Sequence, residues 1–465
     1  MEFIDDSGRI FGLINVIDAL VVLLVLGVAV AGIALVTSQE PAPEPDIAST
    51  HATLDLGSQP QYIVSEINEG DTYSPSEDSR ITITDVYVTP DGNQDRITAR
   101  VKLAGPAKDN AIKYDGAPPR LGRTLAITTD LYEISGDIRA VGSADALDRE
   151  TATVQLEDRV SRTTAESIAP GDEIRVAGRT VATVENVLAY PTDNPTKNDV
   201  LLNVTVHAFD QNGDLHFGDT PLREGQRLTL PLNSASFHGD IRRVNTDLHT
   251  QSTQLLTTAT LDTQTAQDVT TGDLIRMGDT TVATVESVTR YGTNNPDRKR
   301  VLVGLTTQTH QFGEQTYFGQ THVTDGAHIP IQTSQYDVTG TIDRVGATTP
   351  PGTPATKTVT LRKTDVSEPM ADALTTGMVE RSGNKTIAEV TDVDVQPSVV
   401  LIRGDEGDLG VYDHLIDRDV TLTTELRVRE TVSGTQFKGE TIQQGSTVTL
   451  DLGSMTVRAT VVDIS

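Results

Sequence analysis

The 465-residue sequence contains no cysteine and no tryptophan, and aromatic residues make up only 4% of it. Without cysteine the chain has no disulfide, no thiolate metal ligand and no cysteine nucleophile. Its cores must therefore be built mainly from Val, Ile, Leu, Ala and Thr. Val and Thr are abundant, and because β-branched side chains pack well on a pleated surface, the composition favours strands over helices.

Basic residues are also scarce: 37 Lys and Arg stand against 66 Asp and Glu, a formal net charge of −29. Lysine is rarer than arginine, and the acidic residues are spread along the chain instead of forming a tail. Such a surface is typical of halophilic proteins, because dense carboxylates keep a protein hydrated at high salt, and it indicates a haloarchaeal origin. The sequence shows no basic patch that could replace phosphate counterions, so nucleic acid is not an expected partner.

A long apolar stretch lies near the N-terminus. No charged residue occurs from Ala19 to Ser38, and about 20 apolar residues are enough to cross the hydrocarbon core of a bilayer. The stretch has no basic region before it and is longer than the apolar core of a secretory signal peptide. We therefore expect residues 1–38 to contain a retained transmembrane helix, with the lipid bilayer as its partner.

The residues around this stretch suggest how it is placed. Asp18 stands where the helix begins, either as an interfacial residue favoured by the helix dipole or as a polar contact with another membrane helix. Arg9 precedes the stretch, and the next basic residue after it is Arg80. The positive-inside rule then predicts a cytoplasmic N-terminus and an extracellular body. The Pro- and acid-rich segment 39–50 is expected to be an extended spacer.

The rest of the chain repeats one unit. The segment Gly171–Val187 returns as Gly272–Val288, a spacing of 272 − 171 = 101 residues. An earlier copy begins at Gly70 and a looser one at Gly377, where the spacing grows. A constant period of this kind is the signature of tandem modules. We expect four β modules, at residues 51–146, 147–248, 249–350 and 351–465.

Each module has the same predicted order of elements. A short alternating strand such as Thr151–Leu156 is followed by a polar, weakly helical connection and a hairpin that starts at Gly-Asp. A longer strand such as Val200–Val206 and a second glycine-led hairpin, Gly225–Val244, complete the module. The two halves have similar residue patterns, and closing the sheet into a barrel would leave no exposed edge strands. The fold class we predict is mainly β: an N-terminal transmembrane helix followed by four similar small β-barrel-like modules, each closed or nearly closed with pseudo-twofold symmetry.

The N-terminal segment Asp5–Ala19, which runs directly into the apolar helix, resembles an uncharacterised family of membrane-anchored prokaryotic proteins. This family is known as domain of unknown function 4330. The fourth module is similar to its soluble part through Glu368–Leu374, Ala388–Val393 and Val461–Ile464. The resemblance implies a membrane-anchored β protein and implies no activity. The four-fold array is a departure from it.

Few residues suggest chemistry. The nine His are scattered without metal-site spacing, and no nucleophile-elbow, phosphate-loop or dinucleotide motif occurs, so we expect neither enzymatic activity nor a cofactor. Two acidic loops offer oxygen ligands at alternate positions, as calcium loops do, but lack the later bidentate Glu. They are either ordinary hairpin turns or weak calcium sites. Their residues are Asp91, Asn93 and Asp95 in the first loop and Asp210, Asn212 and Asp214 in the second.

The repetition itself is the main indication of function. Modules without a special polar cluster favour a non-enzymatic, single-pass envelope protein that acts as a stalk, scaffold or docking surface. One alternative is a module that binds a small ligand or ion in the fourth copy, where an insertion near Arg403–Ile416 breaks the repeat. Another is a subunit of a membrane-derived filament, with Asp18 as a contact. A protein partner or self-association is therefore possible under each hypothesis.

Overall fold

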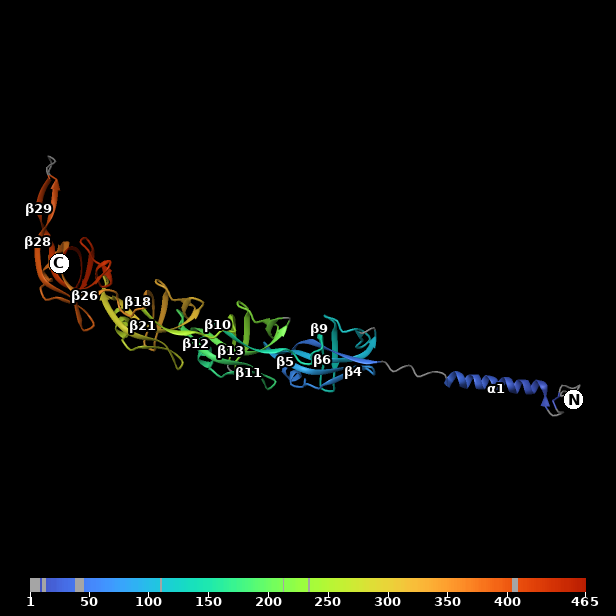
Figure 1. Ribbon diagram of the computed structural model, residues 1–465. Helices are drawn as coiled ribbons and strands as arrows, with labels where there is room; N and C mark the ends of the chain where they lie inside the picture. The colour runs from blue at the N-terminus through green and yellow to red at the C-terminus, as the bar shows by residue number, and fades with distance from the viewer. Residues whose placement is uncertain are drawn as a thin grey trace. The chain divides into compact units, whose positions relative to one another are not determined.

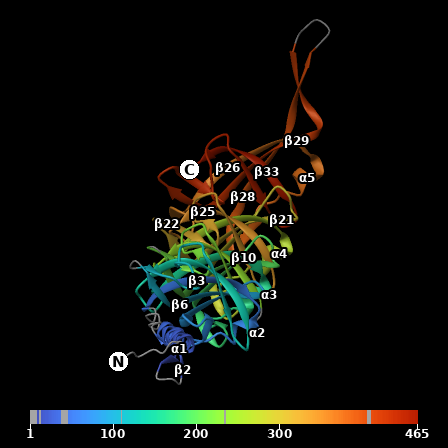
Figure 2. The same cartoon turned by 90° about the vertical axis from the view of Figure 1, so that its right-hand side faces the viewer.

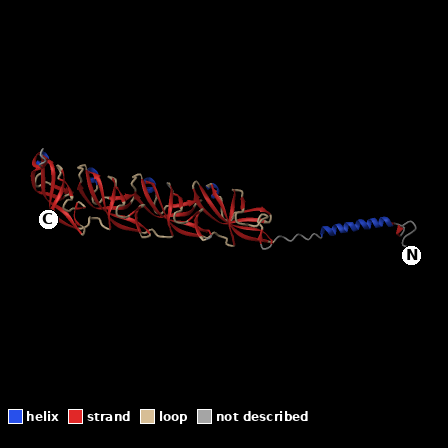
Figure 3. Cartoon of the chain, turned by 90° about the horizontal axis from the view of Figure 1, so that it is seen from above, coloured by secondary structure: helices blue, strands red, loops and turns tan. Residues whose placement is uncertain are grey.

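The computed structural model describes residues 9–10, 14–37, 46–108, 111–211, 213–232, 235–403 and 409–465 (Figure 1). Strands make up most of the described residues outside the N-terminal helix (Figure 3). The chain folds as two compact units. The first is Met1–Val88 with Arg96–Leu147, and the second is Thr89–Asp95 with Asp148–Ser465. The two units are described separately.

The first unit begins with a short antiparallel pair, β1 (Arg9–Ile10) and β2 (Ile14–Asn15), followed by helix α1 (Val16–Thr37). The helix contains most of the apolar stretch, and Asp18 lies exposed in its first turn. In the part of the chain that the structure describes, no helix has the length and apolar character needed to cross a membrane. Residues 39–45 of the predicted spacer, 39–50, lie outside the described residues, and its residues 47–50 belong to strand β3 (Ile47–Gln59).

The remainder of the first unit is one curled antiparallel sheet with the strand order β4-β5-β6-β3-β9-β8, and β7 pairs with β6. Its elements are β3 (Ile47–Gln59), α2 (Gln61–Val64), β4 (Thr72–Ser76), β5 (Ser79–Asp91), β6 (Gln94–Lys108), β7 (Ala111–Ile112), β8 (Thr124–Thr128) and β9 (Glu133–Gly142).

The second unit contains three sheets with this same order, β11-β12-β13-β10-β17-β16 and its two equivalents. The second module comprises β10 (Arg149–Ser161), α3 (Arg162–Ser167), β11 (Glu173–Val176), β12 (Arg179–Pro191), β13 (Lys197–Gln211), β14 (Asp214–Phe217), β15 (Thr220–Pro221), β16 (Arg227–Pro231) and β17 (Ser236–Val244). The third comprises β18 (Thr250–Asp262), α4 (Thr263–Asp268), β19 (Leu274–Met277), β20 (Thr280–Gly292), β21 (Arg298–Phe312), β22 (Gln315–Phe318), β23 (Thr321–His322), β24 (His328–Gln332) and β25 (Asp337–Val345). The fourth comprises β26 (Thr353–Ser367), α5 (Glu368–Asp372), β27 (Val379–Ser382), β28 (Lys385–Arg403), β29 (Leu409–Thr431), β30 (Gly434–Phe437), β31 (Glu440–Thr441), β32 (Thr447–Asp451) and β33 (Thr456–Ile464). The prediction of a mainly β chain with four similar modules is confirmed.

The alternation of apolar and polar residues determines which face of each strand is buried. In β16 the side chains of Leu228 and Leu230 are buried, whereas Arg227 is exposed, because successive residues of a strand point to opposite faces. Burial of each such leucine contributes about 1.5–3 kcal/mol. The first strand of the second module, β10, is longer than the predicted Thr151–Leu156, because polar residues continue its pairing with β13 at both ends.

The two halves of each module do echo each other. The same pair of hydrogen bonds occurs twice in every module, at a glycine with φ between 78° and 95°. The glycine N–H donates to the carbonyl of a residue on the following strand. The N–H of that residue donates in turn to the carbonyl of the residue after the glycine. In the second module Gly171 pairs in this way with Val184, and Gly225 pairs with Ile241. Only glycine adopts such a φ without strain, which explains why the motif recurs. The strand order is symmetric as well, since β11-β12-β13 mirrors β16-β17-β10.

The fourth module departs from the others in one hairpin. Strands β28 and β29 have 19 and 23 residues, compared with 13 and 15 for the equivalent β20 and β21. The extra residues pair with one another from Val399 opposite Asp413 to Arg403 opposite Leu409. Figure 2 shows this hairpin extending beyond the rest of the fourth sheet. The described residues of the insertion predicted near Arg403–Ile416 therefore lie at the end of this hairpin.

Candidate functional site

The first predicted calcium loop is a hairpin turn between β5 and β6. Asp91 ends β5, Gly92 follows with φ 61°, and Asp95 lies in β6. Asn93 is exposed in the turn. Burial raises the pKa of the Asp95 carboxyl, which makes it a poorer cation ligand.

The second predicted loop joins β13 to β14. Asp210 accepts a hydrogen bond from the Gly213 amide at 2.7 Å, and Asp214 forms an ion pair with Arg223 at 2.5 Å. Asn212 lies outside the described residues. Within the described ranges, no group of three or more His, Asp or Glu side chains could hold a metal ion. The observed contacts are those of a turn, and calcium binding stays a prediction.

Buried charges gather instead at the junction between the third and fourth modules, a place that the sequence interpretation missed. Glu380 on β27 is only 2% exposed. Its Oε1 accepts the N–H of Gly292 at 3.2 Å and its Oε2 accepts the N–H of Asp451 at 3.1 Å. The ammonium of Lys438 lies 2.5 Å from Glu380 Oε1 and donates to the carbonyl of Thr449 at 2.7 Å. Both charges of this buried pair therefore have partners.

This pair departs from the repeat at two positions. Glu380 replaces Ile275, which is buried in the core of the third module. Lys438 has φ 55° at the position of Gly319, whose φ is 58°. A residue with a side chain in this conformation costs on the order of 1 kcal/mol or more. Burial lowers the pKa of Lys438, although the Glu380 charge opposes that shift. Local departures of this kind are expected at functional or strained sites.

Two more ion pairs cross the same junction. Lys299 pairs with Asp451, and Arg300 Nη1 lies 2.7 Å from Glu440 Oε1. Lys299 and Asp451 are both about one-fifth exposed, whereas Glu440 is 71% exposed. The third module thus supplies cations and the fourth supplies carboxylates, so the junction is held by complementary charge.

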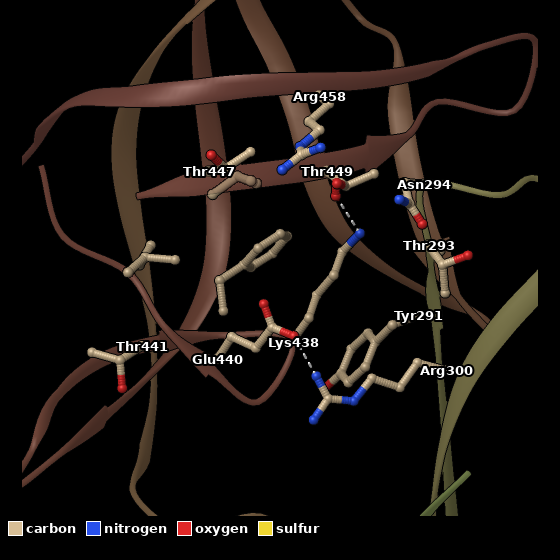
Figure 4. Close-up of a pocket in the computed structure, with 14 residues that line it drawn as sticks. Tyr291, Thr293, Asn294, Arg300, Lys438, Glu440, Thr441, Thr447, Thr449 and Arg458 are labelled. Atoms are coloured by element: carbon tan, nitrogen blue, oxygen red, sulfur yellow. Dashed lines mark hydrogen bonds and ion pairs between the residues drawn. The ribbon is translucent and has the colours of Figure 1, made fainter. Parts of the chain in front are cut away.

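A cavity of about 290 Å³ opens beside these pairs (Figure 4). It is bordered by the end of β20 and the loop after it, by β21, and by strands β30 to β33. In the close-up, Arg458 and Arg300 lie on opposite sides of Lys438. The charged lining consists of Arg300, Lys438 and Arg458 against Glu440 alone. Basic side chains therefore outnumber acidic ones in the lining of this cavity.

The junction between the second and third modules is built differently. Tyr190 is fully buried there, with its ring edge-on to Phe318 at a centroid distance of 4.9 Å and 5.6 Å from the ring of His310. Leu188, Tyr190 and Leu201 of the second module belong to the apolar core of the third. Burial lowers the pKa of His310 to about 4, with a smaller effect from Arg242. The imidazole is therefore neutral near pH 7.

A signal for the buried pair is present in the sequence. When the modules are aligned on their turn glycines at 171, 272 and 377, a carboxylate occupies the inward-facing position of β27 that holds Ile174 and Ile275 in earlier copies. Lys438 likewise replaces a glycine of the β22–β23 turn. Either substitution indicates that this junction differs from the others. Both lie in the copy with the least regular spacing, where the equivalent positions are hardest to align.

Comparison with known proteins gives a family for the N-terminal part only. No curated protein matches the sequence. Residues 1–142, which include α1 and the first module, match the family model described as Domain of unknown function (DUF4330), and the predicted resemblance to this family is therefore confirmed.

Proposed function

We propose that the chain is a single-pass, membrane-anchored and non-enzymatic β-repeat protein that serves as an envelope stalk, scaffold or docking surface. The repetition of one module four times supports this function, since tandem modules are suited to building extended surfaces and not to forming one pocket. The family match is to a domain without an assigned activity.

The observation that carries the proposal is the packing between neighbouring modules of the second unit. Leu188 and Tyr190 enter the core of the following module, and Gln332 donates to the Thr192 carbonyl across the same junction at 2.7 Å. Ion pairs and Glu380 join the next two modules. Modules that contact one another directly resist bending, which is what a spacer or scaffold requires.

The proposed anchor rests on the sequence of α1. Its apolar residues carry no charge after Asp18, and Arg9 on its N-terminal side favours a cytoplasmic N-terminus with the modules outside the cell. In the proposal Asp18 remains at the interface, where a carboxylate costs less than at the bilayer centre.

Protease treatment of intact cells that carry a C-terminal tag tests this placement. We expect the tag to be lost before lysis, while a cytoplasmic marker protein stays intact. Survival of the tag until lysis would place the modules inside the cell and favour a tether that docks soluble partners. A variant without residues 1–38 tests the anchor separately, since it should leave the membrane fraction. If the variant stays with the membrane, the anchor lies elsewhere.

A further inference from the structure

The cavity between the third and fourth modules has a charge opposite to that of the chain. Over the whole sequence acidic residues outnumber basic ones by 66 to 37, yet three basic residues line the cavity against a single acidic one. We propose that this cavity binds a small oxyanion, a ligand that carries carboxylate or phosphate groups.

The three cations differ in how far they are already neutralised. Lys438 is paired with Glu380 behind the cavity wall, and Arg300 is paired with Glu440. Arg458 on β33 is exposed and forms no ion pair with any described residue. Its guanidinium is aimed into the same space as Lys438 (Figure 4). A planar guanidinium binds carboxylate and phosphate oxygens through two parallel hydrogen bonds, so Arg458 is the expected primary contact.

The rest of the lining suits a small polar ligand. Hydroxyl and amide groups of Thr441, Thr447 and Asn294 border the cavity, together with the ring of Tyr291. Such groups donate hydrogen bonds to anionic oxygens and to hydroxyl substituents. A volume near 290 Å³ is at the lower end of ligand-binding pockets, which fits a di- or tricarboxylate or a phosphate ester.

The neighbouring junction provides an internal comparison. The positions of Arg300, Lys438 and Arg458 are occupied there by Asp199, Gly319 and Thr339. Asp199 accepts the N–H of Gln320 at 3.2 Å and pairs with Arg159 at 2.6 Å. All three cations are thus missing at the second–third junction, and a carboxylate of the protein binds the turn instead. The basic lining is a specific property of the third–fourth junction and not a by-product of the repeat.

The strained backbone at Lys438 supports the same conclusion. The equivalent residue of the third module is glycine, which adopts a positive φ freely, whereas Lys438 adopts φ 55° with a side chain attached. Its ammonium lies 5.3 Å from the centre of the Phe437 ring, at the base of the cavity. A strained residue is retained when the surrounding structure needs its side chain, and here it places a positive charge under the cavity.

Calorimetric titration of the full-length protein in detergent, at low salt, tests the proposal with citrate and inorganic phosphate as probes. We expect citrate to bind with one site per chain, and the Arg458→Gln variant to bind it about tenfold more weakly, because charge-assisted hydrogen bonds are lost. Arg427→Gln removes an exposed arginine of β29 outside the cavity and should leave the affinity unchanged. Thermal unfolding of both variants checks that they fold.

Any of three results would overturn the proposal: no heat of binding for either citrate or phosphate with the unaltered protein, equal affinities for Arg458→Gln and the unaltered protein, or equal losses of affinity in Arg458→Gln and Arg427→Gln. Equal losses in Arg458→Gln and Arg427→Gln would mean that the ligand responds to overall charge and not to this cavity. None of these results bears on the stalk or scaffold function, which does not require a ligand.

Discussion

The two junctions within the second unit have the same strand topology and opposite chemistry. Between the second and third modules the contacts are mainly apolar and aromatic, centred on Tyr190. Between the third and fourth they are ionic: Lys299–Asp451 and Arg300–Glu440 cross the junction beside the buried Glu380–Lys438 pair of the fourth module. The repeated fold therefore determines where two modules meet. The side chains at the boundary determine how strongly the modules bind each other and under which conditions.

Individual substitutions explain the difference. Leu188 of the second module is buried, and Thr289 stands at its position in the third. Tyr190 is fully buried, whereas its counterpart Tyr291 is partly exposed. In the described part of the chain, the apolar cluster of the fourth module consists of residues of that module alone. The ionic junction therefore lacks the shared core that joins the second module to the third.

The largest effect is expected at the buried pair. Glu380→Ala leaves Lys438 buried without its counter-charge, and we expect the fourth module to lose about 3–5 kcal/mol of stability. The double variant Glu380→Ile with Lys438→Gly restores the residues of the third module and should recover most of this loss, because an apolar pair needs no desolvation of charge. Denaturant unfolding monitored by hydrogen exchange in β27 and β30 measures both. A double variant that is less stable than the single one would contradict the account.

A somewhat smaller effect is expected from the aromatic contact. Tyr190→Ala should destabilise the second–third junction by about 3 kcal/mol, because it leaves a cavity beside Phe318 and His310. Tyr291→Ala, the matched change at the ionic junction, should cost about 1 kcal/mol, since that side chain is less buried. Hydrogen exchange in β22 and β30 separates the two effects. Equal losses would mean that the junctions do not differ as described.

The pH dependence should also separate the junctions. The folded pKa of His310 is lowered to about 4 from an ordinary value of 6.5, so between these values the unfolded chain binds a proton that the folded chain excludes. Stability is therefore lost as the pH falls from about 6.5 to 4, by at most about 1.4 kcal/mol per pH unit. His310→Phe introduces the residue found at Phe209 and should remove this component. Thermal unfolding of both proteins from pH 7 to 4.5 tests it, and parallel curves would refute the assignment.

The smallest effect is expected from the exposed ion pair. Arg300→Gln removes the contact with Glu440, which is largely exposed, and should cost less than about 1 kcal/mol at low salt. The cost should vanish at 1 M salt, where charges are screened over about 3 Å. Unfolding midpoints at both salt concentrations provide the comparison. A cost that persists at high salt would show that Arg300 acts by packing.

Much of the fold could be predicted from the sequence, because the repeated residues are those that the backbone conformation requires. The glycines at 171 and 272 recur since only glycine suits their φ, and the alternation after them gives the strand faces. The site could not be predicted in this way. Glu380 and Lys438 lie 58 residues apart (438 − 380) and meet only when β27 and the β30–β31 turn come together.

A second contact shows why such residue exchanges between modules are hard to recognise in the sequence. In the third module the Tyr336 hydroxyl donates to Asp273 at 2.7 Å and ties the two hairpins together. In the fourth, Met378 and Met455 occupy these two positions and pack against the core. An Asp and a Met share no property that a pattern search would align. The two changes are explained together, because two apolar side chains that pack against the core replace a hydrogen-bonded pair.

We expect high salt to loosen the ionic junction and to leave the apolar junction unchanged. The chain has no cysteine, so spin labels can be placed on cysteines introduced at the equivalent exposed positions Glu224, Asp325 and Gln444. Electron–electron distance measurements between 0.1 and 2 M KCl should give a narrow, constant distribution for the 224–325 pair and a distribution that broadens with salt for the 325–444 pair. The pair 314–325 within the third module reports whether that module stays folded. If both inter-module distributions respond equally, or only the 224–325 distribution broadens, the distinction between the two junctions is wrong.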